Sequence, residues 1–161
     1  MGDSTRQRLE REFLLALRRA GAVMQLLGAA SADRIGINVT DLNCLNLLAL
    51  RGQMTAGELA KATGLTTASI TGVLDRLEEA GFVRRERDAH DRRRVVVHLD
   101  ATRGLRDVAP VFAPVVEAWR AVAAQYTDEQ LTLILGFQAQ LEQIMRDRLI
   151  ELRGDDQPHP G

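Results

Sequence analysis

The segment from Thr55 to Gly104 constrains the fold more than any other part of this 161-residue chain. Thr55 and Glu58 have the spacing of a capping box, in which each side chain bonds a free backbone N–H group at a helix start. A short helix is therefore expected over residues 56–63. Gly64 follows it, and glycine most easily adopts the left-handed conformation that ends a helix and turns the chain.

A second helix is expected directly after this turn. Thr66 or Thr67 can cap its start and Gly81 can end it. Between these residues, aliphatic side chains recur at a spacing of three and four residues and form one inward stripe, made of Ile70, Val73, Leu74 and Leu77. Two short helices joined by a glycine turn are typical of a helix-turn-helix.

A β-hairpin is expected after the second helix. Phe82 and Val83 can begin its first strand, residues 88–92 make a polar turn, and β-branched and aliphatic residues fill a return strand over 95–99. With one more helix before residue 55, the sequence predicts a mainly α fold: a three-helix core carrying a β-hairpin wing, which is a winged helix-turn-helix.

Three stretches of this segment resemble the MarR family of bacterial winged-helix regulators: GELAKATGL, SITGVLDRLEEAGFVRR and DRRRVVVHL. The segment covers about a third of the chain, and the helix-turn-helix and the arginine-rich hairpin occur together at the family's spacing. One departure is that Leu99 is followed by Asp100 where such proteins usually have Thr, and Gly104 lies one residue later than usual. Asp100 can cap the next helix as Thr would.

The resemblance implies a transcriptional regulator, most often a repressor, that dimerises through its terminal helices. Such a homodimer binds the two half-sites of a pseudo-palindromic operator in double-stranded DNA. The resemblance also implies a cleft between the helical region and the winged lobe that holds a small aromatic effector. The residues expected to line that cleft are Met24, Leu27, Asn43, Asn46 and Leu47. Ordinary core packing and capping are the alternative role for these five residues.

Arginines are concentrated on the hairpin. Residues 84–94 hold six arginines against three acidic residues, a balance of +3, so the rest of a chain with a formal charge of −1 carries −4. Such a run is often only a solvated surface, but on a hairpin directly after a helix-turn-helix it favours contact with phosphate. The residues expected to contact DNA are Thr66, Thr67, Ala68, Ser69, Thr71 and Arg76 of the second helix, with Arg87, His90, Asp91, Arg92, Arg93 and Arg94 of the wing.

The first turns of the second helix lack Arg, Lys, Asn and Gln, the side chains that pair bidentately with guanine or adenine. Hydroxyl groups there can bond either donors or acceptors, and the methyl groups of Ala68 and the threonines suit contacts with thymine methyls. Arg76, two turns on, is placed for a phosphate. The wing arginines can enter a narrow minor groove, with Asp91 orienting one guanidinium. An operator with A·T-rich flanks is therefore expected.

Helices flank the winged lobe, which is expected over about residues 38–100. Ser4 and Gln7 can cap a long first helix, over about 6–33, and Thr40 can cap a leucine-rich one after a connector over 34–39. After the wing, helices are expected over about 101–153. Pro110 and Pro114 should kink or break the first of these, and Thr127 with Gln130 can open the second. Residues 154–161 have the composition of a disordered tail.

The terminal helices are amphipathic. A chain of 161 residues with 45% hydrophobic residues is expected to form a single domain, which has no further element to cover the apolar faces of these helices. A homodimer with interlocking terminal helices is the favoured arrangement. A monomer whose terminal helices pair only with each other is the alternative.

Other functions find little support in the sequence. The three histidines lack the spacing of a zinc site, and no nucleophile with a partnering base or phosphate-binding loop is evident, so no enzyme activity, metal or cofactor is expected. Without an apolar run long enough to span a bilayer, the protein is expected in the cytoplasm. A winged helix that binds a protein and not DNA remains the alternative function.

Cys44 is the single cysteine and lies in the leucine-rich helix. Free cysteine in such a setting usually acts as a small hydrophobic residue, and no basic residue is close in sequence to lower the thiol pKa. A structural role is favoured, with a disulfide between two subunits as the alternative.

Overall fold

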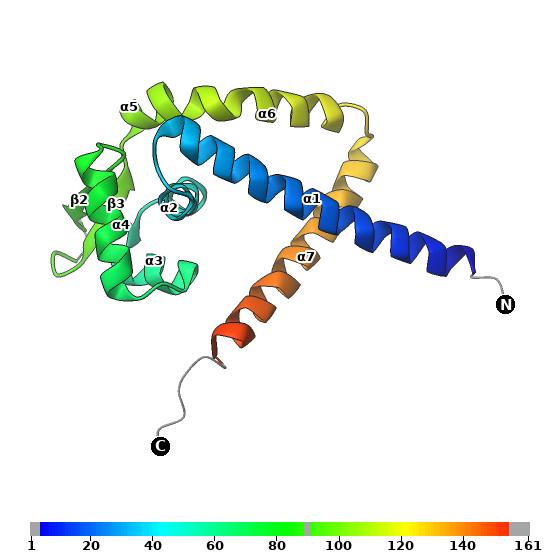
Figure 1. Ribbon diagram of the computed structural model, residues 1–161, viewed down its shortest axis with the longest axis horizontal. Coiled ribbons are helices and arrows are strands. Elements are labelled where there is room, and N and C mark those ends of the chain that lie inside the picture. The colour runs from blue at the N-terminus through cyan, green and yellow to red at the C-terminus, as the bar shows by residue number, and fades with distance from the viewer. Residues whose placement is uncertain (1–3, 89–90, 155–161) are drawn as a thin grey trace, which may run out of the picture. The chain divides into compact units, whose positions relative to one another are not determined.

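The computed structural model describes residues 4–88 and 91–154. The chain divides into two compact units, residues 1–112 and 113–161, which are described here one at a time (Figure 1). The helices and strands of the first unit are α1 (Thr5–Ile35), α2 (Val39–Arg51), β1 (Met54–Thr55), α3 (Ala56–Thr63), α4 (Thr67–Glu79), β2 (Val83–Arg87), β3 (Val95–Leu99), α5 (Ala101–Arg103) and a π-helical segment (Gly104–Val108). Helix α6 (Ala109–Ala123) continues from the first unit into the second, which ends with α7 (Asp128–Gly154).

The predicted capping boxes are present at the starts of α1, α3 and α7. At α3, the Glu58 N–H donates to Thr55 Oγ1 at 3.2 Å, and the Thr55 N–H donates to Glu58 Oε2 at 2.7 Å. Ser4 with Gln7, and Thr127 with Gln130, make the same pair of bonds. These hydrogen bonds confirm the predictions. The motif could be predicted from the sequence because it depends only on residues three positions apart.

Three helices of the first unit end in a left-handed glycine: α1 at Gly36, α3 at Gly64 as predicted, and α4 at Gly81. At the end of α4, Gly81 has a φ of +74°, its N–H donates to the Glu78 carbonyl, and the Phe82 N–H donates to the Leu77 carbonyl at 2.8 Å. This pair of bonds is a Schellman motif, which satisfies carbonyl groups that a helix end leaves free. Gly36 ends α1 in the same way, two residues later than the predicted end near Asp33.

The predicted cap of the leucine-rich helix was wrong by two residues. Helix α2 begins at Val39, and Asn38, not Thr40, is its N-cap. The Asn38 backbone is extended and its Oδ1 accepts a hydrogen bond from the Asp41 N–H at 2.8 Å. Asn caps a helix as well as Thr does, so the earlier of two suitable residues takes the role here.

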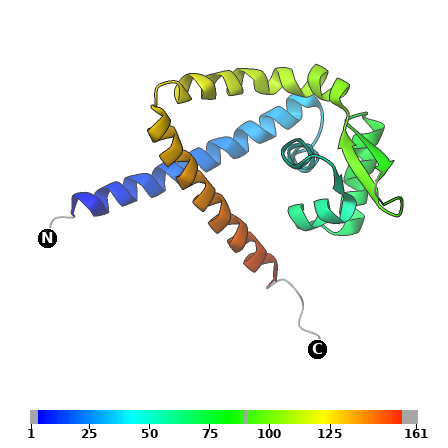
Figure 2. The ribbon, with the colours of Figure 1, turned by 180° about the vertical axis from the view of Figure 1, so that it is seen from behind.

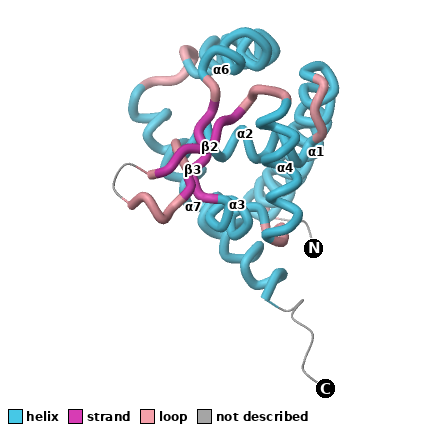
Figure 3. The backbone as a smooth tube through the Cα atoms, turned by 90° about the vertical axis from the view of Figure 1, so that its left-hand side faces the viewer, coloured by secondary structure: helices cyan, strands magenta, loops and turns pink. Residues whose placement is uncertain are grey.

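A three-stranded antiparallel sheet in the order β1-β3-β2 forms the wing and its base (Figure 3). Strands β2 and β3 pair from Val83 opposite Leu99 to Arg87 opposite Val95, which confirms the predicted hairpin. Strand β1 was not predicted. It has two residues and pairs with β3 through Met54 opposite Val97, too short a run for any periodicity to reveal.

The core of the first unit lies among α2, α3, α4 and the sheet. The inward stripe of α4 is buried as predicted, and Phe82, Val83 and Val97 pack against the same cluster. Other members of this cluster are Cys44, Leu45, Leu48, Met54, Leu59 and Ala60. The three-helix core with a hairpin wing is therefore confirmed.

The helix after the wing starts where Asp100 caps it, since Asp100 Oδ1 accepts from the Arg103 N–H at 2.8 Å. Its helical backbone continues from Ala101 to Ala123, with a widened π turn over Gly104–Val108 and Pro114 inside α6. The two prolines were predicted to kink or break this helix. The helix is not broken at either proline, and its backbone widens over Gly104–Val108, just before Pro110. A π turn lets a helix continue past a proline that cannot donate its hydrogen bond.

Most of α1 is exposed in the single chain, and buried residues occur in it only at Ser31 and Ala32 (Figure 2). By length and composition alone this helix could cross a membrane, and among the described residues it is the one helix with this property. Arg18 and Arg19 lie within the apolar stretch. The same pattern arises in a helix that another protein surface covers, so it does not identify a membrane span.

Cys44 is fully buried in the core, and burial, followed by the nearby Asp41 carboxylate, raises its pKa to about 11. We expect the free energy of unfolding to fall as pH rises from 9 to 11, because the unfolded thiol loses its proton first. Two pKa units correspond to about 3 kcal/mol. Urea unfolding of the wild type against Cys44→Ala isolates this effect. An equal pH dependence in both proteins, or peroxide oxidation of folded wild type at neutral pH, would contradict it.

Candidate nucleic-acid interface

The first turns of α4 present a surface of hydroxyl and methyl groups. The predicted contacts Thr66, Thr67, Ala68, Ser69 and Thr71 are all exposed. Thr66 Oγ1 accepts from the Ser69 N–H at 3.1 Å as the N-cap, and Thr71 Oγ1 donates to the Thr67 carbonyl at 2.9 Å. The Thr71 hydroxyl hydrogen is therefore used inside the helix, which leaves an acceptor lone pair and a methyl group for a partner.

Backbone hydrogen bonds close the wing. The Asp88 N–H donates to the Arg94 carbonyl at 3.0 Å, and the Arg94 N–H donates to the Asp91 carbonyl at 2.9 Å. Asp91 was expected to orient a guanidinium, but its Oδ1 accepts from the Arg93 backbone N–H at 3.0 Å. Its observed role is to shape the turn. The predicted contact His90 lies outside the described residues.

The wing arginines fall into two groups. Arg87 donates to the Arg92 carbonyl at 3.1 Å, and Arg94 pairs with Glu58 on α3 at 3.1 Å. Arg92 and Arg93 are exposed, and their guanidinium groups make no ion pair with any residue of 4–88 or 91–154. These two side chains are therefore available to an outside anion.

Glu58 connects the wing to the start of α3. A hydrogen bond from the Thr55 N–H, with a further one from the Thr55 hydroxyl, lowers the pKa of Glu58 below its ordinary value. The carboxylate consequently stays ionised opposite Arg94 across the physiological pH range. Residue spacing identified Glu58 as a capping residue but gave no sign that it also reaches the wing.

Arg85 joins the wing to α4, a role that the sequence did not reveal. Its guanidinium pairs with Glu78 at 2.6 Å and with Asp75 at 2.7 Å, and its backbone N–H donates to Glu78 at 3.1 Å. The side chain is 28% exposed. Because both carboxylates belong to α4, this pair of contacts fixes β2 relative to the helix that presents the threonines.

Arg76 has a partner inside the protein. Its Nε and Nη2 donate to the two carboxylate oxygens of Asp41 at 3.2 and 2.7 Å, and the hydrogen bond to Asp41 raises the pKa of Arg76. Asp41 is 3% exposed, whereas the Arg76 side chain is 53% exposed. The contact of Arg76 with phosphate stays a prediction, and any such contact has to use the donors that Asp41 leaves free.

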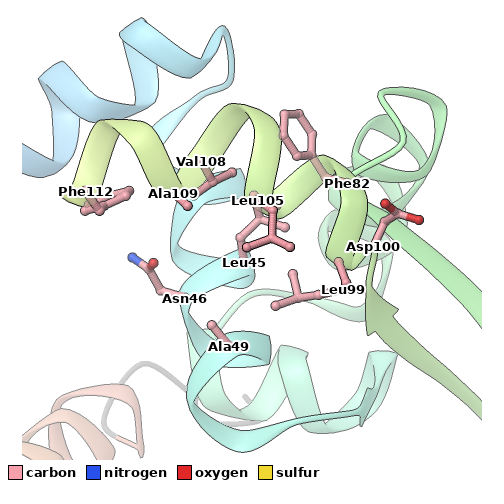
Figure 4. A pocket seen from close by; sticks show the side chains of 12 residues that line it. Leu45, Asn46, Ala49, Phe82, Leu99, Asp100, Leu105, Val108, Ala109 and Phe112 are labelled. Atoms are coloured by element: carbon pink, nitrogen blue, oxygen red, sulfur yellow. The ribbon is translucent and has the colours of Figure 1, made fainter.

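An apolar cavity of about 500 Å³ lies between α2, the base of the wing and the helix that follows the wing (Figure 4). Leu45 of α2 and Leu105 of the π-helical segment line it, and Asn46 and Asp100 are polar residues of its wall. Its remaining lining residues are Ala49, Phe82, Leu99, Ala101, Gly104, Val108, Ala109 and Phe112.

Of the five residues predicted for an effector cleft, Asn46 is the one that lines this cavity. Met24 and Asn43 are exposed, and Leu27 and Leu47 are half-buried elsewhere. The part of the chain that the structure describes contains no cluster of three or more residues able to hold a metal ion.

A MarR family model matches residues 35–94, which hold the helix-turn-helix and most of the wing. YcgE of Bacillus subtilis (strain 168), named as an uncharacterized HTH-type transcriptional regulator, is 39% identical over 150 residues, covering 93% of this chain and 97% of YcgE. The chain belongs to the MarR family. FarR of Neisseria gonorrhoeae, another HTH-type transcriptional regulator, is 31% identical over 109 residues, which is 66% of this chain and 74% of FarR.

Solved structures have the same fold. A MarR family protein of Bacillus stearothermophilus is 26% identical, with a TM-score of 0.64 over 90% of this chain and 99% of its own. A mutant of S. aureus MepR, solved bound to an oligodeoxyribonucleotide, is 20% identical, with a TM-score of 0.54 over 84% of this chain and 96% of its own. At that identity the MepR comparison shows a shared fold only.

We expect Arg93→Ala to weaken operator binding by about 1 to 3 kcal/mol and to lower the salt slope by about 1, because its guanidinium makes no ion pair with residues 4–88 or 91–154 and is available to a phosphate. Fluorescence anisotropy at several salt concentrations measures both quantities. Arg120→Ala in α6 is the matched control, since it removes the same charge from an exposed pair with Glu117. Wild-type affinity and slope in Arg93→Ala would contradict a phosphate contact.

Proposed function

We propose that this MarR family member is a homodimeric, sequence-specific DNA-binding transcriptional regulator, and specifically a repressor that a small ligand releases from its operator. The observation that carries the proposal is the pairing of two exposed surfaces in the first unit: the threonine-rich start of α4, and a wing on which Arg92 and Arg93 make no ion pair with any described residue. The regulators YcgE and FarR support it, as does the oligonucleotide bound to a protein of the same fold.

The chemistry of these two surfaces indicates which base sequence they recognise in DNA. Threonine methyls and Ala68 offer apolar contacts to thymine, and two unpaired arginines suit a narrow, electronegative minor groove. We expect the flanks of the operator to be rich in A·T pairs for this reason. Cytoplasmic location follows from the function, since the operator is chromosomal DNA of a bacterial cell.

Dimerisation is supported by exposed apolar side chains on the terminal helices. A monomeric protein rarely leaves so many large hydrophobic residues exposed. They lie on α1 (Leu9, Phe13, Leu14, Leu15, Val23, Met24 and Leu26), on α6 (Trp119 and Val122) and on α7 (Leu133, Leu135, Phe137, Ile144, Met145, Leu149, Ile150 and Leu152). A second copy of the chain offers the same faces and buries both sets.

The effector proposal rests on the apolar cavity. Its volume is within the range of about 300 to 1,000 Å³ typical of small-molecule sites. Its lining includes no Lys, Arg or His, and Asn46 and Asp100 are the polar side chains. The cavity therefore suits a small, neutral aromatic compound better than an aromatic acid. A ligand there touches both α2 and the helix after the wing.

We expect a duplex carrying the operator to be shifted by the protein at 50 mM salt and bound at least tenfold more weakly at 200 mM, because phosphate contacts release counterions. Gel shift at the two salt concentrations tests this, with a scrambled duplex as the control. A protein that binds no duplex at either concentration would instead be a protein-interaction module with a winged-helix fold.

Deletion of residues 136–161 should give monomeric or aggregated protein that cannot bridge half-sites about 10 base pairs apart, because the deletion removes most of the exposed apolar face of α7. Analytical ultracentrifugation of the full chain and the truncated chain measures the assembly. A full-length protein that sediments as a monomer while binding DNA tightly would contradict the dimer.

Selection of binding sites from random duplex DNA should return a pseudo-palindrome with A·T-rich flanks. Guanine–cytosine pairs in those flanks should weaken binding at positions that no side chain touches, because they widen the minor groove. Ser69→Ala or Thr71→Ala should cost less affinity than Arg93→Ala. A consensus that is dominated by guanines in the major groove, with indifferent flanks, would contradict this account.

A further inference from the structure

The contact between Asp41 and Arg76 links the start of α2 to the last turn of α4, and Asp41 is the most deeply buried carboxylate in any ion pair of the described residues. The Asp41 side chain is 5% exposed, and its Oδ2 also accepts from Asn38 Nδ2 at 3.0 Å. A buried carboxylate is costly without a charged, hydrogen-bonded partner, so Asp41 and Arg76 hold each other. Two parallel N–H···O bonds fix the plane of the guanidinium as well as its position.

Only one edge of the Arg76 guanidinium is used in this pair. Nε and Nη2 face Asp41, while Nη1 lies 3.8 Å from the position that a Cβ on Gly72 would occupy, one turn nearer the start of α4. No described residue accepts a hydrogen bond from Nη1, and the side chain is 53% exposed. Nη1 is therefore a donor held in place beside Gly72 and not used by any described residue.

This free donor lies on the same side of the recognition helix as part of the proposed DNA surface. Ala68, Gly72 and Arg76 are four residues apart and share one face of α4. Ala68 is exposed, Gly72 is half-buried, and both have small side chains, so a DNA backbone can approach this face closely. Arg76 stands at the far end of the face, where a phosphate is the group within reach.

We infer that Asp41, which is buried and touches no DNA itself, is a positioning residue for DNA binding: it holds Arg76 so that Nη1 meets a backbone phosphate. The inference rests on the proposed function and extends it to a residue outside the recognition helix and the wing. It also assigns the ion pair a second role beyond joining α2 to α4.

The Asp41→Asn variant gives a sharp test because charge alone acts in the opposite direction. Removal of one negative charge strengthens binding to a polyanion in general, whereas loss of a positioning contact weakens it. We expect Asp41→Asn to bind the duplex selected by the wild-type protein about tenfold more weakly, and Arg76→Gln to do the same with a salt slope lower by about 0.9. Glu117→Gln in α6 is the matched charge control.

The double variant Asp41→Asn with Arg76→Gln should bind no more weakly than Arg76→Gln alone, because both changes remove one contact. Thermal unfolding followed by circular dichroism checks that each variant is folded at the assay temperature. Arg76→Lys keeps the charge but cannot form the two parallel hydrogen bonds to Asp41. This variant tests the inference if Asp41→Asn does not fold. We expect Arg76→Lys to lose affinity with a nearly unchanged salt slope.

Three outcomes would overturn the inference. Asp41→Asn could bind the duplex as tightly as the wild type or more tightly, or Arg76→Lys could keep wild-type affinity. The third is a double variant whose fold-loss of affinity equals the product of the two single fold-losses. Each would leave Asp41 and Arg76 as a structural pair. Failure of the wild-type protein to bind any duplex in a salt-dependent way would instead contradict the proposed function itself, so the two failures are distinguishable.

Discussion

Burial of the aliphatic stripe of α4 is the constraint on which the rest of the winged unit depends. Ile70, Leu74 and Leu77 are fully buried, and each contributes about 1.5 to 3 kcal/mol through removal from water. A helix has one rotational setting that buries such a stripe, and that setting turns the opposite face outward. The threonines and Ala68 are exposed for this reason, so the packing of the core also determines the surface offered to a partner.

Carboxylates at the edge of this core hold the cations that surround it. Asp75 and Glu78 on α4 bind Arg85 of the wing, and Glu58 on α3 binds Arg94. Each of these pairs is at least partly exposed and contributes little to stability on its own, because water and salt screen it. Their effect is geometric: they restrict the wing to one position relative to α4, so the two surfaces are presented together.

Much of the fold could be predicted because it depends on neighbours in sequence. Spacings of three or four residues predict the capping box at Thr55 and Glu58 and the inward stripe of α4. The turn at Gly64 is predicted from the glycine itself. Two of the missed ion pairs depend on residues far apart in the sequence. Asp41 and Arg76 are 35 positions apart, and Glu58 and Arg94 are 36. Their pairing exists only after α2, α3, α4 and the wing have packed.

The lining of the cavity also depends on residues that are distant in the sequence. Its wall combines α2, the base of the wing and the helix after it, so its lining is set by how three elements meet and not by any local pattern. Asn46 was expected there from the resemblance to the family. Leu99 was predicted only as part of the return strand, and no local pattern marked Leu105 as a lining residue.

The arginines of the wing look alike in the sequence but differ in the folded chain, where some are paired and others are not. Residues 84–94 hold six arginines, and a count of charge treats them as equal. In the folded chain Arg84, Arg85 and Arg94 are each paired with a carboxylate, and Arg87 donates to a backbone carbonyl of the wing. Arg92 and Arg93 alone keep unpaired guanidinium groups within the described part of the wing. A paired wing arginine offers a phosphate fewer free donors and a partly neutralised charge, whereas an unpaired one gives up only water. The guanidinium groups without an ion pair in the described part of the wing are therefore concentrated at its turn, while the paired arginines help to determine where that turn lies.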